Sequence, residues 1–220
     1  YQWAEGLSGD TLKLFLNELI DEHTIFTYDQ VKYLLAETDK DPNNPDNIIL
    51  FYTGLSVSST WDFGNTYNRE HVWAKSHGSF GNDDGPGSDM HHLRPAMPIV
   101  NTYRSNLDFD EGGTLVPNTT DCYKDGDSFE PRDEVKGDVA RIMFYMVVRY
   151  EGYDGFVDLE LTENVDTSGP FFGKLSILLK WNLEDPVDEF EMNRNNVIYS
   201  YQHNRNPFID HPEFAELIWG

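Results

Sequence analysis

Hydrophobic residues recur at helical spacing in several stretches of the chain. Between residues 10 and 22, apolar side chains fall three or four positions apart, which predicts a helix with Asp10 as its N-cap. A similar pattern predicts a helix over 28–37. The strongest stripe follows Pro131, a residue favoured in the first helical turn. Its apolar positions, which predict a core-facing helix, are Val135, Val139, Ile142, Met143, Met146 and Val147.

Other stretches predict a strand, loops and shorter helices. The apolar run over 48–53 has the length of a strand, and the glycine-rich, polar segment 81–89 is typical of a loop. Residues 111–129 are polar and predict irregular structure. Further helices are expected near 172–181, 187–201 and 211–219. Without repeats or a linker, the chain is expected to form one α+β domain over 1–220, mostly helical around a small strand-bearing site.

The charge of the chain narrows the possible functions. Of its 220 residues, 39 are acidic and 16 are Lys or Arg, which gives a formal net charge of -23. Such a charge opposes long-range attraction to a polyanion, which argues against a sequence-scanning DNA-binding module. The charge argues less against an enzyme that binds phosphate at short range through a metal ion and a few arginines. The one cysteine, Cys122, excludes an intrachain disulfide, and no apolar run is long enough to predict a membrane span.

One stretch differs from the rest in both charge and composition. Residues 68–106 contain four acids and four bases, so this stretch sums to zero while the whole chain carries -23. It also holds four of the seven histidines, which are His71, His77, His91 and His92. We interpret this stretch as the active site.

The residues of this stretch suit metal-assisted hydrolysis of a phosphodiester. Imidazole is a proton acceptor near neutral pH, which makes His71 a candidate base, and the adjacent Glu70 is a hard oxygen ligand for Mg²⁺ or Ca²⁺. Pro98 predicts the start of a helix, on which Asn101 and Arg104 share one face. Asn101 could then hold a metal ion while Arg104 reaches the substrate phosphate.

The adjacency of Glu70 and His71 raises a geometric problem. In a regular strand, neighbouring side chains point to opposite faces. Both residues can serve one site only if the strand ends or bulges there, so we expect irregular backbone at this pair or an ion reached from the far side of the ribbon. From the residues alone, the alternative also stands that Glu70 is a surface acid and His71 a hydrogen-bonded structural histidine.

Three blocks of sequence resemble the endonuclease I family of non-specific bacterial nucleases. They are NREHVWAKSHG, DMHHLRPAMPIVNTYRSN and, near the end of the chain, YQHNRNPFIDHPEFAELIW, in the order and spacing of the family. The resemblance implies a ββα-metal (His-Me finger) motif over about residues 66–108. The cysteines that form disulfides in some members are missing here, so the chain resembles the cysteine-poor branch.

The resemblance also implies roles for the central residues. His71 corresponds to the general base that activates water, and Glu70 and Asn101 correspond to the ligands of one Mg²⁺-like ion, with Ca²⁺ or Mn²⁺ as alternatives. The implied reaction is sequence-non-specific hydrolysis of DNA, and also of RNA, to 5′-phosphate and 3′-hydroxyl ends.

The remaining cationic and imidazole side chains receive supporting roles. Arg104 is the first candidate for a contact with phosphate, Arg69 and Arg205 are weaker candidates, and Arg94 is a further one. For Arg94, a structural salt bridge is an equal alternative. His91 and His92 are expected to orient or pack behind the site, and His77 is expected on the surface.

Two other classes of function remain open from the sequence. The four clustered histidines could form a zinc site, structural or hydrolytic, and a nuclease scaffold could serve as a non-catalytic binding module. As a nuclease, the protein is expected to be a monomer with nucleic acid as its substrate and no membrane association. The family resemblance implies that it is secreted or periplasmic.

Overall fold

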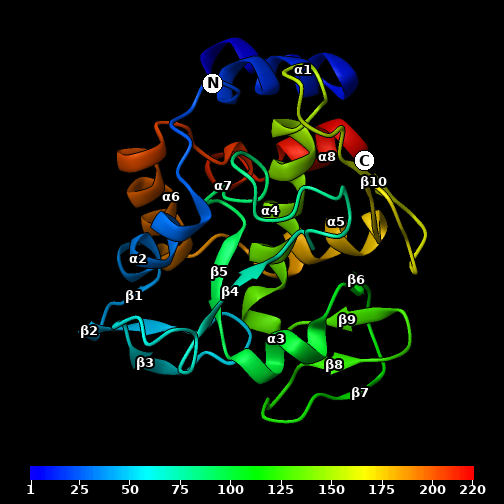
Figure 1. The fold of residues 1–220 in the computed structure, drawn as a ribbon. Coiled ribbons are helices and arrows are strands. Elements are labelled where there is room, and N and C mark those ends of the chain that lie inside the picture. Colours follow the sequence, from blue (N-terminus) through cyan, green and yellow to red (C-terminus); the bar gives the residue numbers. More distant parts are fainter.

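A buried helix, α4 (Lys136–Arg149), lies at the centre of the molecule, as Figure 1 shows in the computed structural model of residues 1–220. Thirteen of its fourteen residues are buried. The expected start at Pro131 is only approximate, because a 3₁₀ turn, η2 (Asp133–Val135), precedes the α-helix. Helices α1, α5 and α7 pack against α4, so the predicted apolar stripe does face the core.

The other helices surround this core. They are η1 (Gln2–Ala4), α1 (Gly9–Ile20), α2 (Tyr28–Thr38), α3 (Pro98–Arg104), α5 (Leu175–Glu184), α6 (Glu189–Gln202), α7 (Pro207–Asp210) and α8 (Phe214–Trp219). The helices expected from the hydrophobic pattern are therefore present. The N-cap of α1 is Ser8 rather than Asp10, which lies in the first turn, and α7 was not anticipated as a separate helix.

The strands form several small sheets, which together with the helices give the expected α+β class. One antiparallel sheet consists of β1 (Lys40–Asp41), β2 (Asn44–Ile49) and β3 (Ser56–Ser58). Another, in the order β6-β9-β8-β7, consists of β6 (Asp108–Phe109), β9 (Ser128–Glu130), β8 (Tyr123–Lys124) and β7 (Thr114–Leu115). A parallel pair consists of β10 (Glu160–Thr162) and β11 (Phe171–Gly173).

Two expectations about strands were wrong. The strand expected over 48–53 already ends at Ile49, because residues 51–53 turn back toward β3. The segment 111–129, expected to be irregular, contributes β7, β8 and the start of β9. Its strands are two or three residues long, too short for an alternating hydrophobic pattern to reveal.

A hairpin followed by a helix occupies the charge-balanced stretch. Strand β4 (Asn68–His71) pairs antiparallel with β5 (Leu93–Ala96), from Asn68 opposite Ala96 to His71 opposite Leu93, without a shift in register. Helix α3 follows and begins at Pro98, as the sequence predicted. No bulge separates Glu70 from His71. The strand instead ends at His71, after which the Val72 amide still donates to the His92 carbonyl at 3.1 Å.

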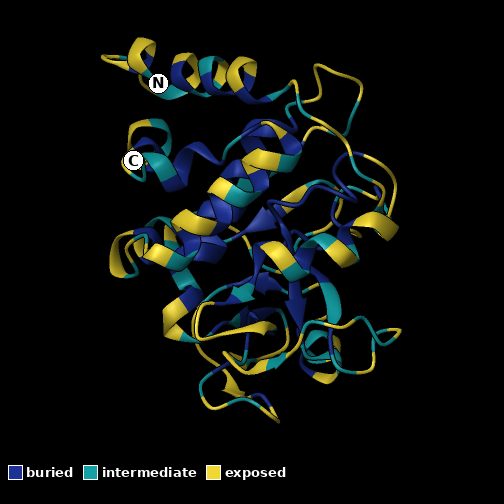
Figure 2. Ribbon diagram, turned by 90° about the vertical axis from the view of Figure 1, so that its left-hand side faces the viewer, coloured by how far each residue is buried: buried dark blue, intermediate teal, exposed yellow.

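The main core joins both ends of the chain to its middle. A cluster of 34 buried apolar residues includes Leu12 and Leu16 of α1, Phe109 of β6 and Phe208 of α7. Figure 2 shows the buried residues concentrated along the central elements, with exposed residues on the outer faces of the surrounding helices.

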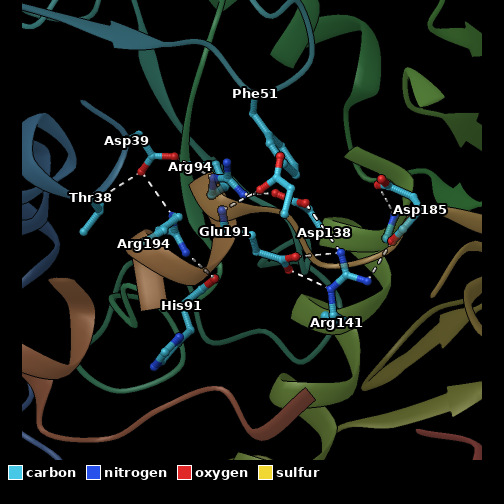
Figure 3. Close-up of polar contacts among 12 residues, drawn as sticks. Thr38, Asp39, Phe51, His91, Arg94, Asp138, Arg141, Asp185, Glu191 and Arg194 are labelled. Atoms are coloured by element: carbon cyan, nitrogen blue, oxygen red, sulfur yellow. Dashed lines mark hydrogen bonds and ion pairs between the residues drawn. The ribbon is translucent and has the colours of Figure 1, made fainter. Parts of the chain in front are cut away.

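Buried ions connect β5 to the helices around it (Figure 3). Arg94 of β5 donates to Asp39, which directly follows α2, at 2.7 Å, and to Asp138 of α4 at 3.0 Å. The other oxygen of Asp39 accepts from Arg194 of α6 at 3.2 Å. Asp39, Arg94 and Arg194 are each at most 3% exposed, and the two carboxylates, Asp39 and Asp138, neutralise the two arginines inside the fold.

The same network continues into α6. Arg141 of α4 makes two hydrogen bonds to the carboxylate of Glu191, at 2.8 and 2.6 Å. Arg194 also donates to the carbonyls of Met90 and Leu93, at 2.6 and 2.8 Å. The network therefore fixes both the position of β5 and the segment that leads into it. We call Asp39, Arg94, Asp138, Arg141, Glu191 and Arg194 the buried ion cluster.

A second buried group anchors the segment before β5. The carboxylate of Asp89 accepts hydrogen bonds from the hydroxyls of Tyr145 and Tyr150, each at 2.8 Å, from Gln202 at 2.9 Å and from the His91 amide at 2.9 Å. Burial by itself would raise the pKa of Asp89. The neighbouring His23 and His91, with the bonds from Gln202 and the His91 amide, outweigh burial and hold that pKa well below its usual range.

Removing one charge from the buried ion cluster should destabilise the protein strongly. The Asp39→Asn variant leaves Arg94 and Arg194 without their shared counter-ion, so we expect a loss of about 3–5 kcal/mol in the free energy of unfolding. Urea denaturation measures this loss. Asp29→Ala, which breaks an exposed ion pair with Lys32, is the matched control and should cost about 1 kcal/mol or less. A loss for Asp39→Asn as small as that of the control would contradict the prediction.

The stability contributed by Asp89 should depend on pH. Because its folded-state pKa is depressed, this contribution is complete above the unfolded pKa of about 3.9 and is lost as pH falls further. We expect Asp89→Asn to cost about 3 kcal/mol at pH 7, and the difference from the unsubstituted protein to shrink below about pH 4. Urea denaturation across this pH range measures it, with Asp84→Asn as the exposed control in the same loop. A difference independent of pH would show that the charge of Asp89 is not responsible.

Candidate active site

A polar pocket of about 390 Å³ opens where β4 ends, between the N-terminus of α2 and helix α3. Four of the sequence-predicted site residues line it, and they are Arg69, Glu70, His71 and Asn101. The remaining lining residues are Tyr28, Asn68, Ala74, Lys75, Ser76, Ser105 and Asn106. The end of β4 and α3 therefore bring together groups that lie 30 positions apart in the sequence.

The imidazole of His71 is held in one orientation. Its Nε2 lies 2.9 Å from the carbonyl oxygen of Gly87, and because a carbonyl only accepts hydrogen bonds, Nε2 carries the proton. Nδ1 is then the unprotonated nitrogen of the neutral ring, and it is neither bonded to the chain nor enclosed by it. The ring stacks on Tyr28 with centroids 5.2 Å apart.

Burial keeps His71 neutral. Only 7% of the residue is exposed, and this desolvation, reinforced by His92, lowers the pKa of His71 well below that of a free histidine. The hydrogen bond to Gly87 acts in the opposite direction but does not reverse the shift. The unprotonated Nδ1 is therefore available as a proton acceptor at neutral pH.

The carboxylate of Glu70 is supported on one oxygen and free on the other. Oε1 accepts from the Tyr52 hydroxyl at 2.8 Å and lies 3.3 Å from Nε of Arg104, as an ion pair rather than an aligned hydrogen bond. Oε2 has no partner in the chain and is not enclosed. Burial raises the pKa of Glu70 to about 6, against the opposing effects of Arg104 and Tyr52.

The side-chain amide of Asn101 completes a set of oxygen donors. Asn101 lies one turn into α3, lines the pocket and makes no hydrogen bond through its side chain. A carboxylate oxygen and an amide oxygen that face one polar pocket are hard ligands, the type that Mg²⁺ and Ca²⁺ prefer. The residues present therefore fit a hard divalent ion with an incomplete protein shell.

The structure does not place Arg104 where the sequence suggested. Arg104 is fully buried, and its guanidinium donates to the carbonyls of Val72 at 2.6 Å and Ser105 at 3.1 Å. Its face lies over the ring of Phe109, 4.8 Å from the ring centre. Arg104 therefore supports Glu70 from behind rather than lining the pocket, which corrects the expectation of a direct phosphate contact.

Of the other arginines, only Arg69 lines the pocket. Arg94 belongs to the buried ion cluster, and Arg205 is paired with Asp210 at 2.7 and 2.6 Å, outside the pocket. The expected phosphate contact through Arg94 is therefore corrected, because internal carboxylates neutralise it, and Arg205 lies outside the pocket in an ion pair that is partly exposed. The pocket instead contains Lys75, a cation of the charge-balanced stretch that the sequence analysis did not single out.

The neighbouring histidines lie behind the pocket. His92 has its Nε2 2.6 Å from the Pro86 carbonyl, and its ring centre is 5.4 Å from that of His71. His91 packs on Tyr145, farther back. Both are buried, and burial lowers the pKa of each to about 4, so both rings are neutral.

The expectation for His77 was wrong. This residue is only 2% exposed, and its two ring nitrogens lie 2.7 Å from the carbonyl of Phe171 and 2.9 Å from that of Asn106. His77 therefore connects the segment after α3 to β11. Its partners lie far away in the sequence, so the polar residues around it in the chain did not indicate that it is buried.

The four histidines do not form a zinc site. The structure contains one group of three or more His, Cys, Asp or Glu residues whose ligand atoms all lie within 4.8 Å of one another, and it consists of Glu151, Asp158 and Glu160. No histidine belongs to it. The alternative of a histidine-rich zinc centre is therefore contradicted, since His77 and His91 are bonded elsewhere.

No helix of the protein has both the length and the apolar character needed to cross a bilayer.

Comparison with known proteins agrees with the geometry. The family model for Endonuclease I matches residues 8–213. The whole chain is 57% identical to an extracellular ribonuclease of Bacillus subtilis (strain 168) and 58% identical to one of Bacillus amyloliquefaciens, covering 77% of each. An extracellular deoxyribonuclease of Aeromonas hydrophila is 28% identical over 56% of the chain and 49% of its own length. Over nearly its whole length, the chain therefore belongs to the endonuclease I family.

Proposed function

We propose that the protein is a divalent-metal-dependent endonuclease that hydrolyses phosphodiester bonds of RNA and DNA to 5′-phosphate and 3′-hydroxyl ends. One observation carries this proposal. The free Nδ1 of His71 shares a pocket with the free oxygen of Glu70 and the free amide of Asn101. The relatives named as ribonucleases and deoxyribonucleases support both substrates.

In this proposal His71 is the general base. Nδ1 takes the proton of the water that attacks the phosphorus, while the Nε2 proton remains bonded to the Gly87 carbonyl. That carbonyl orients the ring and favours the positive charge that forms on it. The stacked Tyr28 prevents the ring from turning away from the pocket.

Glu70 and Asn101 would hold one Mg²⁺ ion, with Ca²⁺ or Mn²⁺ as alternatives. When bound, such an ion neutralises charge on the scissile phosphate and on the 3′-oxygen that leaves. Arg104 and Tyr52 act on Glu70: they counter the effect of burial and keep the carboxylate ionised and fixed. Arg104 is thus a positioning residue in this proposal.

Arg69 and Lys75 are proposed to contact the substrate phosphates. They are the two cations that line the pocket, in a chain of net charge -23. The pocket presents no set of side chains arranged to read base edges, which supports cleavage without sequence preference. We further propose that the protein acts as a monomer outside the cytoplasm, in line with the relatives named extracellular.

Removal of the base should abolish most of the activity. We expect His71→Ala to lower the rate of cleavage of plasmid DNA and of a labelled RNA by about 10²–10⁴-fold, and EDTA to stop cleavage by the unsubstituted protein. Gel assays measure both. His203→Asn is the matched control, because His203 is exposed and adopts a left-handed conformation that asparagine tolerates. Full activity of His71→Ala would remove this residue from the role of base.

Metal binding should depend on the charge of Glu70. Glu70→Gln keeps the shape of the side chain but removes the negative charge, so we expect the affinity for Mg²⁺ to fall by more than about tenfold. Isothermal titration calorimetry measures this without substrate. The control is Glu37→Gln, an exposed glutamate paired with Lys40 on the surface. An unchanged Mg²⁺ affinity would show that the ion binds elsewhere.

A further inference from the structure

A continuous series of planar side chains leads outward from His71. The ring of Tyr28, at the start of α2, stacks on His71 with an angle of 12° between the planes. The guanidinium carbon of Arg69 lies 3.7 Å from the centre of the Tyr28 ring and 5.1 Å from that of Trp61. Arg69 is therefore held between two aromatic rings at the edge of the pocket.

The series continues from Trp61 to the surface. The Lys32 ammonium lies 5.9 Å from the centre of the Trp61 ring and 4.8 Å from that of Tyr33, which is 60% exposed. Lys32 and Tyr33 belong to α2, whereas Trp61 comes from the loop before β4. We call Tyr28, Arg69, Trp61, Lys32 and Tyr33 the aromatic row.

The loop that carries Trp61 exposes another ring. Phe63 is 92% exposed, the largest exposed fraction among the large apolar residues of the chain. Its φ of 63° lies in the left-handed region, which bulky residues rarely adopt. Both the exposure and the backbone conformation are unfavourable for folding, and strained conformations of this kind cluster at functional sites.

We propose that the aromatic row and Phe63 bind an unpaired, single-stranded segment of the nucleic acid beside the scissile phosphate. Every base has a flat face that stacks on an aromatic ring, and cations between the rings match the phosphates of the backbone. Tyr33, Trp61 and Phe63 stack bases, and Arg69 carries the strand into the pocket. The proposal rests on the nuclease function proposed above, whose site it extends.

The charges around the aromatic row favour nucleic acid as its occupant. The chain is strongly acidic, whereas the aromatic row holds Arg69, a cation that lies on two rings and forms no ion pair with a carboxylate. Two acids of the same segments are engaged: Asp29 pairs with Lys32, and the carboxylate of Asp62 accepts from the backbone amides of Asn65 and Thr66. Because Arg69 lines the pocket, the row is also continuous with the proposed active site.

A base can stack on these rings only when it is not already stacked inside a duplex. The aromatic row should therefore favour single strands and loops over paired regions, in RNA and DNA alike, without a preference for particular bases. A contact with the backbone alone would favour both forms equally.

Kinetics on matched substrates test this inference. Tyr33→Ala and Phe63→Asn remove exposed rings, and asparagine tolerates the left-handed conformation of residue 63. For a labelled single-stranded octanucleotide, we expect each substitution to raise KM about tenfold with little change in kcat. For the same sequence within a duplex, KM should not change, and on a dinucleotide, too short to reach Tyr33, the effect should shrink.

Two variants control for the loss of an exposed ring. Trp3 is 79% exposed and Tyr153 is 74% exposed, and neither belongs to the pocket or the aromatic row. Trp3→Ala and Tyr153→Ala should leave KM unchanged on every substrate. Equal effects of Tyr33→Ala on single strand and duplex, or no effect on either, would overturn the proposal.

A binding measurement separates this inference from the nuclease function. Fluorescence anisotropy of the labelled octanucleotide with the His71→Ala protein reports binding without cleavage. If the unsubstituted protein cleaves neither substrate while Tyr33→Ala still weakens binding of the single strand, the nuclease proposal fails and the aromatic row stands. If cleavage is normal and Tyr33→Ala, in the His71→Ala background, binds the single strand as tightly as before, the aromatic row fails alone.

Discussion

The position of the site depends on the charges buried around β5. Asp39 and Asp138 together neutralise Arg94 and Arg194, and these two arginines hold β5 and the segment before it against α4 and α6. Buried charges are tolerated only in nearly fixed geometry, because displacement would leave one of them unpaired away from water. Strand β4 pairs with β5 in a regular register. The buried ions that fix β5 therefore also fix the positions of Glu70 and His71 on β4.

Neighbouring polar groups also fix the orientation of the two side chains, Glu70 and His71, that face the pocket. Glu70 is stabilised behind the pocket by Arg104 and Tyr52, and its second oxygen has no partner in the chain, which suits the ion of the proposed function. The Nε2–H of His71 donates a hydrogen bond to the Gly87 carbonyl and Nδ1 stays free, so the tautomer of the ring is fixed before any substrate binds. Groups held in this way need little reorganisation during a reaction, the condition under which electrostatic stabilisation is most effective.

A strongly acidic protein that acts on nucleic acid must bind phosphate with a few cations placed close to the site, because its net charge repels the substrate. Here two cations, Arg69 and Lys75, line the pocket, and several other arginines are paired with carboxylates inside the fold, as Arg94 is with Asp39 and Asp138. Stacking of aromatic rings does not depend on net charge and is less sensitive to salt than ion pairing. The aromatic row would therefore supply affinity that the overall charge of the chain cannot.

The sequence by itself determined the helices with long apolar stripes and the start of α3 at Pro98, because periodicity and side-chain type are local properties. The resemblance to the endonuclease I family supplied the hairpin before α3, and the side-chain types of Glu70, His71 and Asn101 made them candidates for the site. Only the tertiary structure decided which cations are free. Arg94 and Arg104 are as basic in the sequence as Arg69, yet carboxylates and carbonyls that lie far away in the chain or across the hairpin occupy them. Charge neutralisation requires contacts in space, and sequence spacing does not encode them.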